Sequence, residues 1–324
     1  MTTLFVATTG GHLEQLDALA ERIPADGPAL WVTHENDQSR SLLSERDVEF
    51  VPYVRVRNVR DVAACVPTAH RLWRRWSVTR AVSTGSGIAL GYLPYLASRG
   101  VSCHYVESAA RVSGPSRTGR VLERTPRIHR YTQYPHWAGP RWHHRGSVFD
   151  SYEPEGALRP VGPVIQVVVT VGTAAEFPFR RLIDHLAPLL VPDGHLATVT
   201  GRPVQVLWQT GCTPTDHLPI DAVPFVPADS LGAAIADADL VVSHAGAGSA
   251  LTALSAGRRP LLASRAADLG EAGDDHQWQL ADELQRRGLA VHVPPTKITI
   301  DDLRDALGAA VRRSVAPTPF ELVP

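Results

Sequence analysis

The hydrophobic positions of this 324-residue chain fall into short apolar runs that alternate with helical patterns. An apolar run followed by a polar turn and a helical repeat is typical of a strand, loop and helix in a parallel sheet. The first half predicts strands at 4–9, 30–34, 48–52, 78–82 and 103–106, and helices at 13–23, 66–76 and from 88 to about 98. The second half predicts a strand ending near 243, a helix at 250–257, a strand at 260–264 and a helix at 278–287. We therefore expect an α/β fold.

The length of the chain favours two domains, since a domain usually contains about 100–200 residues. Hydrophobic residues make up 44% of the chain and charged residues 20%, so each domain can bury a core. Proline and glycine cluster between Tyr152 and Pro163, and such clusters mark connections. We predict an N-terminal domain at 1–157 and a C-terminal domain at 158–324.

Cysteine use and hydropathy indicate the compartment. Cys65, Cys103 and Cys212 lack metal-ligand spacing, and their odd number does not suit a disulfide framework. No apolar run has the length needed to cross a bilayer, and the first residues lack the basic flank of a secretion signal. We expect a cytoplasmic protein that binds no metal.

The net charge of −1 hides an asymmetry between the halves. Residues 1–162 hold 20 Lys and Arg against 15 Asp and Glu, a balance of +5, and residues 163–324 hold 12 against 18, a balance of −6. Arginines concentrate at 55–80, where Trp73 and Trp76 accompany them, and at 111–145. Such runs form either a solvated surface or a docking surface for an anionic membrane or lipid-linked substrate. They lack a motif that reads nucleic acid, so we expect no nucleic-acid partner.

A glycine-rich loop is the strongest chemical signal. Residues 241–249, Val-Val-Ser-His-Ala-Gly-Ala-Gly-Ser, predict a strand, a loop and the start of a helix. The free N–H groups and the dipole of a helix N-terminus attract phosphate, and glycine lets it approach the backbone. Ser249 could cap the helix or bond a phosphate oxygen. The alternative is an ordinary strand–helix connection, because such loops are weak signals alone.

A second polar loop follows the next predicted strand. Residues 268–277 carry carboxylates, an imidazole and an amide that suit the hydroxyl groups of a sugar. Loops that follow neighbouring parallel strands open on the same edge of a sheet, where such folds bind ligands. Asp274 and Asp275 could instead cap the helix that follows.

Two residues of the first half are acid–base candidates. His12 lies between the first predicted strand and its helix, where an imidazole could act as a general base or simply pack. Glu107 lies at the end of the strand at 103–106 and could act likewise, or pair with a nearby arginine. The residues alone leave these alternatives open.

The second half resembles the donor-binding half of MurG-related GT-B glycosyltransferases. The resemblance depends on Ser-His-Ala-Gly-Ala-Gly-Ser at 243–249 and Gly-Glu-x-x-Asp-Asp-His-Gln at 270–277. It extends to Thr-Val-Gly-Thr at 170–173, Phe-Pro-Phe at 177–179 and Gln-Thr-Gly at 209–211. Within that family the motifs are most similar to the catalytic subunit of the two-subunit chitobiose-type N-acetylglucosaminyltransferase, in its bacterial polysaccharide branch.

The first half resembles the anchoring subunit of the same transferase. The matching segments are 8–13, 32–34, 83–89, 105–108, 110–112 and 116–120. The chain therefore looks like a fusion of the anchoring and catalytic subunits. The eukaryotic anchoring subunits begin with a membrane helix and this sequence does not, so contact with the inner membrane face would be peripheral.

The resemblance implies a GT-B fold, with two Rossmann-like domains facing across a cleft, and an inverting hexosyl transfer that needs no metal. The donor would be a UDP-sugar and the acceptor a saccharide on polyprenyl diphosphate, in exopolysaccharide or capsule biosynthesis. His12 or Glu107 would be the base. The residues expected to hold the donor are Gly172, Thr173, Gln209, Gly211, His244, Ala245, Gly246, Ala247, Gly248, Ser249, Thr252, Asp274, Asp275, His276 and Gln277. Thr252 stands where many relatives carry a glutamate that meets the ribose.

Two other functions fit the same features less well. A nucleotide-sugar epimerase of GT-B-like fold would need paired carboxylates around the sugar, and the sequence shows no clear pair. A non-catalytic binding or scaffold subunit would have no use for the acid–base candidates. The products formed would separate the three functions.

Overall fold

A computed structural model describes residues 2–24, 27–55, 58–172 and 176–323. The chain forms two compact units, one of residues 1–150 with 316–324 and the other of residues 151–315. The division falls before the predicted boundary at 157 because β8 (Tyr152–Pro154) pairs antiparallel with β15 (Val311–Arg313) in the second unit. The last residues return to the first unit, which the sequence did not indicate.

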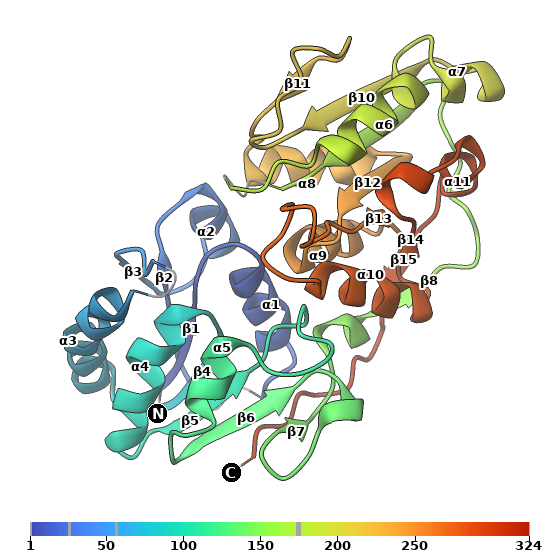
Figure 1. Cartoon of the computed structure of the whole chain (residues 1–324). Coiled ribbons are helices and arrows are strands. Elements are labelled where there is room, and N and C mark those ends of the chain that lie inside the picture. Colours follow the sequence, from blue (N-terminus) through green and yellow to red (C-terminus); the bar gives the residue numbers. More distant parts are fainter. Residues whose placement is uncertain (1, 25–26, 56–57, 173–175, 324) are drawn as a thin grey trace. The chain divides into compact units, whose positions relative to one another are not determined.

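The first unit contains a seven-stranded parallel sheet in the order β3-β2-β1-β4-β5-β6-β7 (Figure 1). Its strands are β1 (Thr2–Ala7), β2 (Ala29–His34), β3 (Val48–Val51), β4 (Val78–Gly85), β5 (Ser102–Val106), β6 (Ile128–Thr132) and β7 (His143–His144). Its helices are α1 (Gly11–Ala20), α2 (Asp37–Leu42), α3 (Val59–Trp76), α4 (Gly87–Ser98) and α5 (Arg117–Leu122), with short 3-10 turns η1 (Pro135–Trp137) and η2 (Val148–Ser151).

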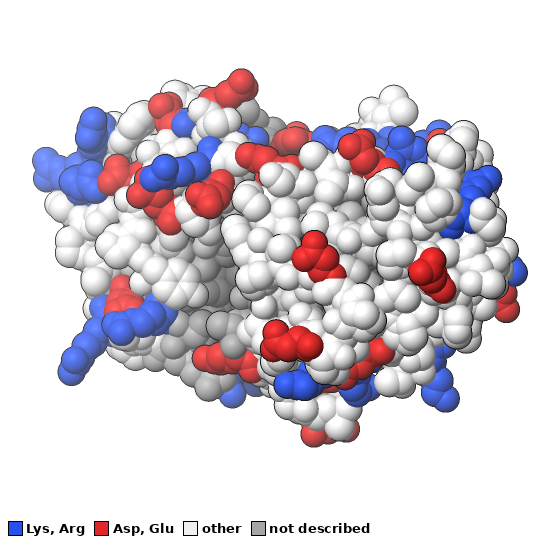
Figure 2. Space-filling view, turned by 90° about the horizontal axis from the view of Figure 1, so that it is seen from above, with Lys and Arg blue, Asp and Glu red and all other residues white. Residues whose placement is uncertain are grey.

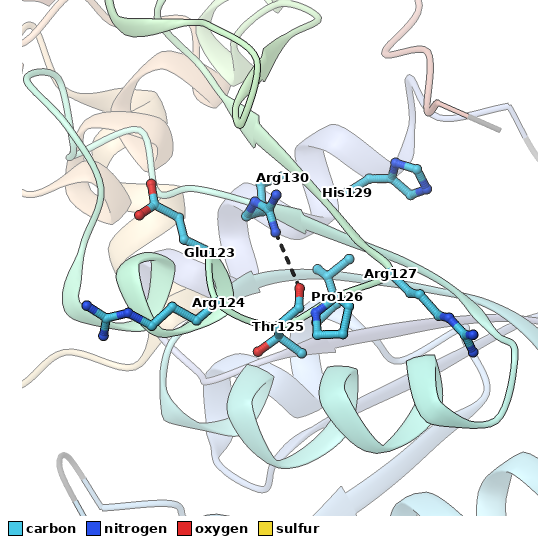
Figure 3. A pocket seen from close by; sticks show the side chains of 8 residues that line it. Glu123, Arg124, Thr125, Pro126, Arg127, His129 and Arg130 are labelled. Carbon is cyan, nitrogen blue, oxygen red and sulfur yellow. Dashed lines mark hydrogen bonds between the residues drawn. The ribbon is translucent and has the colours of Figure 1, made fainter.

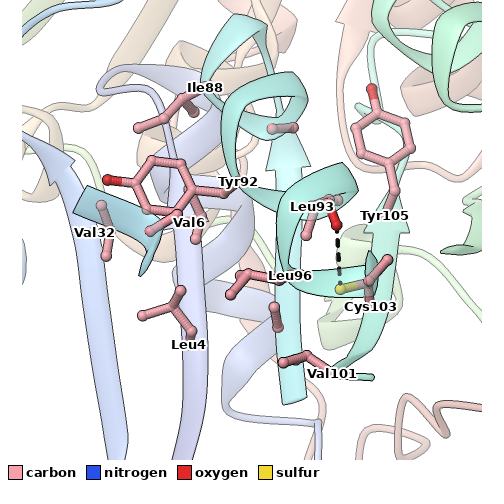
Figure 4. Close-up of a cluster of buried hydrophobic side chains, with 14 of the residues drawn as sticks. Leu4, Val6, Val32, Ile88, Tyr92, Leu93, Leu96, Val101, Cys103 and Tyr105 are labelled. Carbon is pink, nitrogen blue, oxygen red and sulfur yellow. Dashed lines mark hydrogen bonds between the residues drawn. The ribbon is translucent and has the colours of Figure 1, made fainter. Parts of the chain in front are cut away.

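An apolar core joins α3 and α4 to one face of this sheet. Tyr92 and Leu96 of α4 lie with Leu4, Val6 and Val32 of the strands in one buried cluster (Figure 4). Every one of these side chains is at most 2% exposed. Burial at this level stabilises the folded state by roughly 1.5–3 kcal/mol for a large apolar side chain.

The helix predicted at 66–76 begins earlier, at Val59. Asn58 caps it, because its side-chain oxygen accepts hydrogen bonds from the N–H groups of Arg60 (3.0 Å) and Asp61 (3.2 Å). Pro67 lies inside this helix rather than at its start. A proline lacks a donor for one helical hydrogen bond, but here the cap and the packed face of the helix outweigh that loss.

The second unit contains a six-stranded parallel sheet in the order β11-β10-β9-β12-β13-β14. Its strands are β9 (Ile165–Thr170), β10 (Val204–Gln209), β11 (Ala222–Val223), β12 (Leu240–His244), β13 (Leu261–Ala263) and β14 (Val291–His292). Its helices are α6 (Arg180–Leu190), α7 (His195–Thr200), α8 (Ala228–Asp237), α9 (Ala247–Ser255), α10 (His276–Arg286) and α11 (Ile300–Asp305), with the 3-10 turn η3 (Pro295–Lys297).

Both sheets have the strand order of a Rossmann fold. In each sheet, its first and fourth strands along the chain are neighbours (β1 with β4, and β9 with β12), and the connections from them run in opposite directions. Ligands of such sheets bind at this switch point, outside the carboxyl ends of the strands. The fold therefore directs attention to the loops after β1 and β4 in the first unit and after β9 and β12 in the second.

Candidate functional site at the carboxyl edges of the two sheets

The N-terminus of α9 lies at the switch point of the second unit. The helix begins at Ala247 rather than at the predicted 250, and Gly246 occupies the N-cap position without a side-chain cap. The N–H of Ala250 donates to the oxygen of Gly246, so the N–H groups of residues 247–249 precede the first helical hydrogen bond. Ser249 lies within the first turn and does not cap the helix. These N–H groups suit an anion.

His244 fills the space between two glycines. A Cβ atom at Gly172, whose φ is +73°, would lie 2.7 Å from Cε1 of His244, and a Cβ at Gly246 would overlap Nε2 of the same ring. Burial, followed by the positive charge of Arg265, lowers the pKa of His244 to about 3. The ring is therefore neutral at physiological pH and stands beside the α9 terminus. Thr173, which was predicted to help hold the donor, lies outside the described residues.

Arg265 and Glu271 hold the loop after β13 against the loop after β9. The guanidinium of Arg265, which is 4% exposed, donates to the main-chain oxygens of Val171, Phe177 and Glu271. Glu271 accepts two hydrogen bonds from Arg181, at 2.8 and 2.7 Å. The guanidinium of Arg265 is thus committed to main-chain oxygens of these two loops.

The 274–277 segment brings its polar groups to the start of α10. Asp274 accepts a hydrogen bond from the Nδ1 atom of His276. Asp275 occupies the N-cap position but makes no side-chain cap, and its carboxylate faces the N–H of Ala267 at 3.4 Å. The side chain of Gln277 is nearly buried and accepts from the N–H of Arg265 at 3.2 Å. Asp274, Asp275 and His276 therefore keep unburied side chains, whereas that of Gln277 is buried.

Four other predicted donor residues have structural bonds. The amide of Gln209 donates to Thr170 (2.8 Å) and accepts from the N–H of Val226 (2.9 Å), while being only 2% exposed. The N–H of Gly211 donates to the oxygen of Pro224, and the hydroxyl of Thr252 donates to the oxygen of Gly248 (3.1 Å). Gln209 and Gly211 thus fix the loop at 224–226, and Ala245 links β12 to the end of β13 through its N–H.

In the first unit, His12 lies at the switch point, where it follows β1 and bonds to the end of β4. Its Nδ1 atom lies 2.8 Å from the main-chain oxygen of Thr84 and must carry the proton, since a carbonyl only accepts. Nε2 therefore keeps its lone pair. Burial lowers the pKa of His12, partly offset by the bond to Thr84, and the charge of Arg111 lowers it further. The imidazole is oriented and neutral, as a general base requires.

Glu107 is enclosed by hydrogen-bond donors. One carboxylate oxygen accepts from the hydroxyl of Tyr105 and the N–H of Ser108, both at 3.0 Å, and the other accepts from the N–H (2.8 Å) and hydroxyl (3.0 Å) of Ser116. The side chain is 1% exposed, and burial raises its pKa. These contacts fasten the loop at 108–116 to the sheet edge and leave little access for a substrate.

A surface hollow elsewhere in the first unit has a different character. It is lined by residues 123–130, at the amino end of β6 and away from the switch point. Figure 3 shows Arg124 and Arg127 directed apart, and Arg130 donates to the oxygen of Thr125 at 3.5 Å. The basic groups do not converge, so the hollow is not a built anion site.

Comparison with known sequences identifies a domain in the second half. Residues 166–318 match the glycosyltransferase family 28 C-terminal domain. A UDP-N-acetylglucosamine--N-acetylmuramyl-(pentapeptide) pyrophosphoryl-undecaprenol N-acetylglucosamine transferase of Solibacter usitatus is 32% identical over 147 residues, which is 43% of this chain and 37% of the relative. The transferase of the same name from Ralstonia nicotianae is 36% identical over 167 residues, 48% of this chain and 42% of the relative. The matches thus span about two fifths of these relatives.

Solved structures confirm the predicted fold. MurG of Acinetobacter baumannii is 18% identical, with a TM-score of 0.55 over 94% of this chain and 89% of its own. The glycosyltransferase SnogD of Streptomyces nogalater is also 18% identical, with a TM-score of 0.59 over 95% and 91%. At this identity the similarity shows the architecture, the GT-B fold with its two Rossmann-like domains.

Proposed function

We propose that the chain is a MurG-related hexosyltransferase that uses a UDP-sugar donor, because residues 166–318 match the glycosyltransferase family 28 C-terminal domain and the fold is GT-B. The observation that carries this proposal is the α9 N-terminus beside the neutral His244. The three N–H groups at the start of α9 would stabilise a diphosphate, as a metal ion does in metal-dependent transferases. The unburied side chains of Asp275 and His276 would bind hydroxyl groups of the sugar.

The proposed reaction is a single inverting displacement without a metal. Nε2 of His12 takes the proton from an acceptor hydroxyl, whose oxygen forms a bond to C1 of the donor sugar. The bond between C1 and the diphosphate oxygen breaks, and its electron pair leaves with UDP. The N–H groups of residues 247–249 stabilise that negative charge. Of the two candidate bases, His12 has the suitable orientation, and Glu107 would position the loop at 108–116.

The proposed acceptor is a saccharide on polyprenyl diphosphate, in exopolysaccharide or capsule biosynthesis. Both relatives are named for transfer to a pyrophosphoryl-undecaprenol substrate. The peripheral membrane contact would involve α3, which lies at the left-hand edge of the first unit where basic side chains gather (Figures 1 and 2). Arg74 and Arg75 on α3 are exposed, whereas Trp73 and Trp76 pack against the core and are half-buried. Within the described residues, no helix has the length and apolar character to cross a membrane.

Thermal stabilisation by UDP-, GDP- and TDP-sugars tests the donor site. A ligand that binds only the folded state raises the melting temperature by mass action. We expect one UDP-sugar to do so, and Gly248→Asp to abolish the shift by placing a carboxylate where the diphosphate binds. An acidic residue in the first turn of a helix does not itself destabilise it. Gly232→Asp, on α8 with open space around it, is the matched control and should keep the shift.

Product analysis separates the alternatives. A new glycolipid identifies the transferase, an isomerised nucleotide sugar identifies an epimerase, and donor binding without either product identifies a binding or scaffold subunit. If no nucleotide sugar shifts the wild-type protein at millimolar concentration, the proposed donor site is wrong.

A further inference from the structure

The chain passes between the two units twice, and a buried arginine of the first unit bonds to both of the segments beside these crossings. Arg22 follows α1 and is 5% exposed. Its guanidinium donates to the oxygen of Ser147 and lies 3.8 Å from the carboxylate of Asp150, the last residue before the chain enters the second unit. Its Nε donates at 2.9 Å to the oxygen of Thr318, just after the chain has returned.

The returning segment, residues 316–324, is an integral part of the first unit. The N–H of Phe320 donates to the oxygen of Arg22 at 2.8 Å, and the Phe320 side chain is fully buried. The ring of Phe320 lies 5.6 Å from that of Tyr131 on β6, and the Tyr131 hydroxyl accepts from the N–H of Val323 at 2.8 Å. We name this segment the C-terminal strap.

A buried hydrogen-bonded path continues from Arg22 to the sheet edge. The hydroxyl of Ser147 donates to the side-chain oxygen of Gln133 (3.3 Å), and the Gln133 amide donates to the main-chain oxygen of Glu107 (3.0 Å). It also faces Gln15 at 3.4 Å, on the helix that carries His12. Each of these side chains is at most 1% exposed. Buried networks of this kind have few alternative arrangements, because any unpaired member is costly.

We propose that Arg22 is a positioning residue that couples docking of the C-terminal strap to the geometry of the carboxyl edge of the first unit's sheet, where His12 lies and the proposed acceptor binds; we name it the acceptor edge. With the strap docked, the path through Ser147 and Gln133 fixes the loop after β5 and the first turn of α1. With the strap released, that edge loosens while the donor loops of the second unit keep their own bonds. The proposal concerns use of the acceptor and rests on the proposed function.

The test compares Arg22→Met with Phe320→Ala, which releases the strap from its other end. Arg46→Met is the control, since Arg46 pairs with Asp17 of α1, which is not a member of the path through Ser147 and Gln133. Hydrogen exchange is followed at the strap and at the amide of Ala109, which donates to Gln15 at 2.7 Å. In both variants we expect hydrogen exchange to accelerate at least tenfold at the strap and at the Ala109 amide together. In the control we expect no acceleration at either.

Activity provides a second measurement. With the UDP-sugar of the largest thermal shift, and farnesyl diphosphate-linked glucose or N-acetylglucosamine as acceptor, kcat/KM for the acceptor should fall at least tenfold in both variants. The donor-induced thermal shift should remain. Faster exchange at the strap with an unchanged Ala109 amide would overturn the coupling. Absence of donor binding in the wild type would instead contradict the proposed function, and the exchange result would still decide the role of Arg22. If Arg22→Met does not fold, the exchange of Phe320→Ala at the strap and at the Ala109 amide alone decides whether the two are coupled.

Discussion

Substitution of Gly172 by alanine should destabilise the second unit through a specific contact with His244. An alanine at φ +73° costs about 1 kcal/mol because a Cβ disfavours left-handed backbone. Its Cβ would also lie 2.7 Å from Cε1 and 3.0 Å from Nε2 of the ring, which Gly246 confines on the other side. Overpacking of this kind costs roughly 1–3 kcal/mol. We therefore expect a loss of roughly 2–4 kcal/mol in the free energy of unfolding.

Gly201 provides the matched control. Its φ is +65°, and a Cβ there would meet no atom within 4 Å. Gly201→Ala should therefore show only the backbone cost of about 1 kcal/mol. Urea unfolding of both variants measures the difference between their losses in the free energy of unfolding. In the double variant Gly172→Ala with His244→Ala most of this extra loss should disappear, which is a coupling energy between the two positions. Equal losses at Gly172 and Gly201, or no coupling to His244, would refute the packing argument.

Three further predictions concern the acceptor edge and the donor loops. His12→Gln should lower kcat/KM by about 10²–10⁴-fold with an unchanged donor-induced thermal shift, and the acid limb of the wild-type pH–rate profile should lie below pH 6.5, because the lowered pKa keeps the base neutral to more acidic pH. Ser116→Ala should cost about 1–3 kcal/mol in the free energy of unfolding, since Glu107 loses a buried hydrogen-bond donor; a urea midpoint equal to that of wild type would contradict this. Arg265→Lys should abolish the UDP-sugar shift, since one ammonium group cannot reach three carbonyls, whereas Arg202→Lys, which also bonds carbonyls but is exposed, should keep it.

Local sequence patterns predicted the sheets and the position of the donor loop. Apolar runs followed by glycine-rich turns are local signals, and the strands near 4–9, 30–34 and 103–106 are present with shifts of a few residues. The predicted start of α9 is three residues late, because Gly248 and Ser249 in the first turn have weak helix propensity. Packing of the helix against β12 overrides that weakness.

Roles that depend on distant partners could not be predicted. The side chain of Gln209 was expected near the nucleotide, yet its bonds to Thr170 and Val226 use its amide inside the protein. The importance of Arg22 depends on partners 125 and 296 positions along the chain, and no local pattern records such separations. A ligand-binding motif and a buried structural contact use the same residue types, and only the fold distinguishes them.

The C-terminal strap also sets an order of assembly during synthesis. The second unit is one continuous stretch, residues 151–315, and contains all of its own strands when the last of them leaves the ribosome. The first 150 residues emerge earlier, but the side chain of Phe320 and the Thr318 oxygen that accepts from Arg22 come only with residues 316–324. The unit made first is therefore completed after the second, and a chain that stops before residue 316 lacks a component of the unit made first.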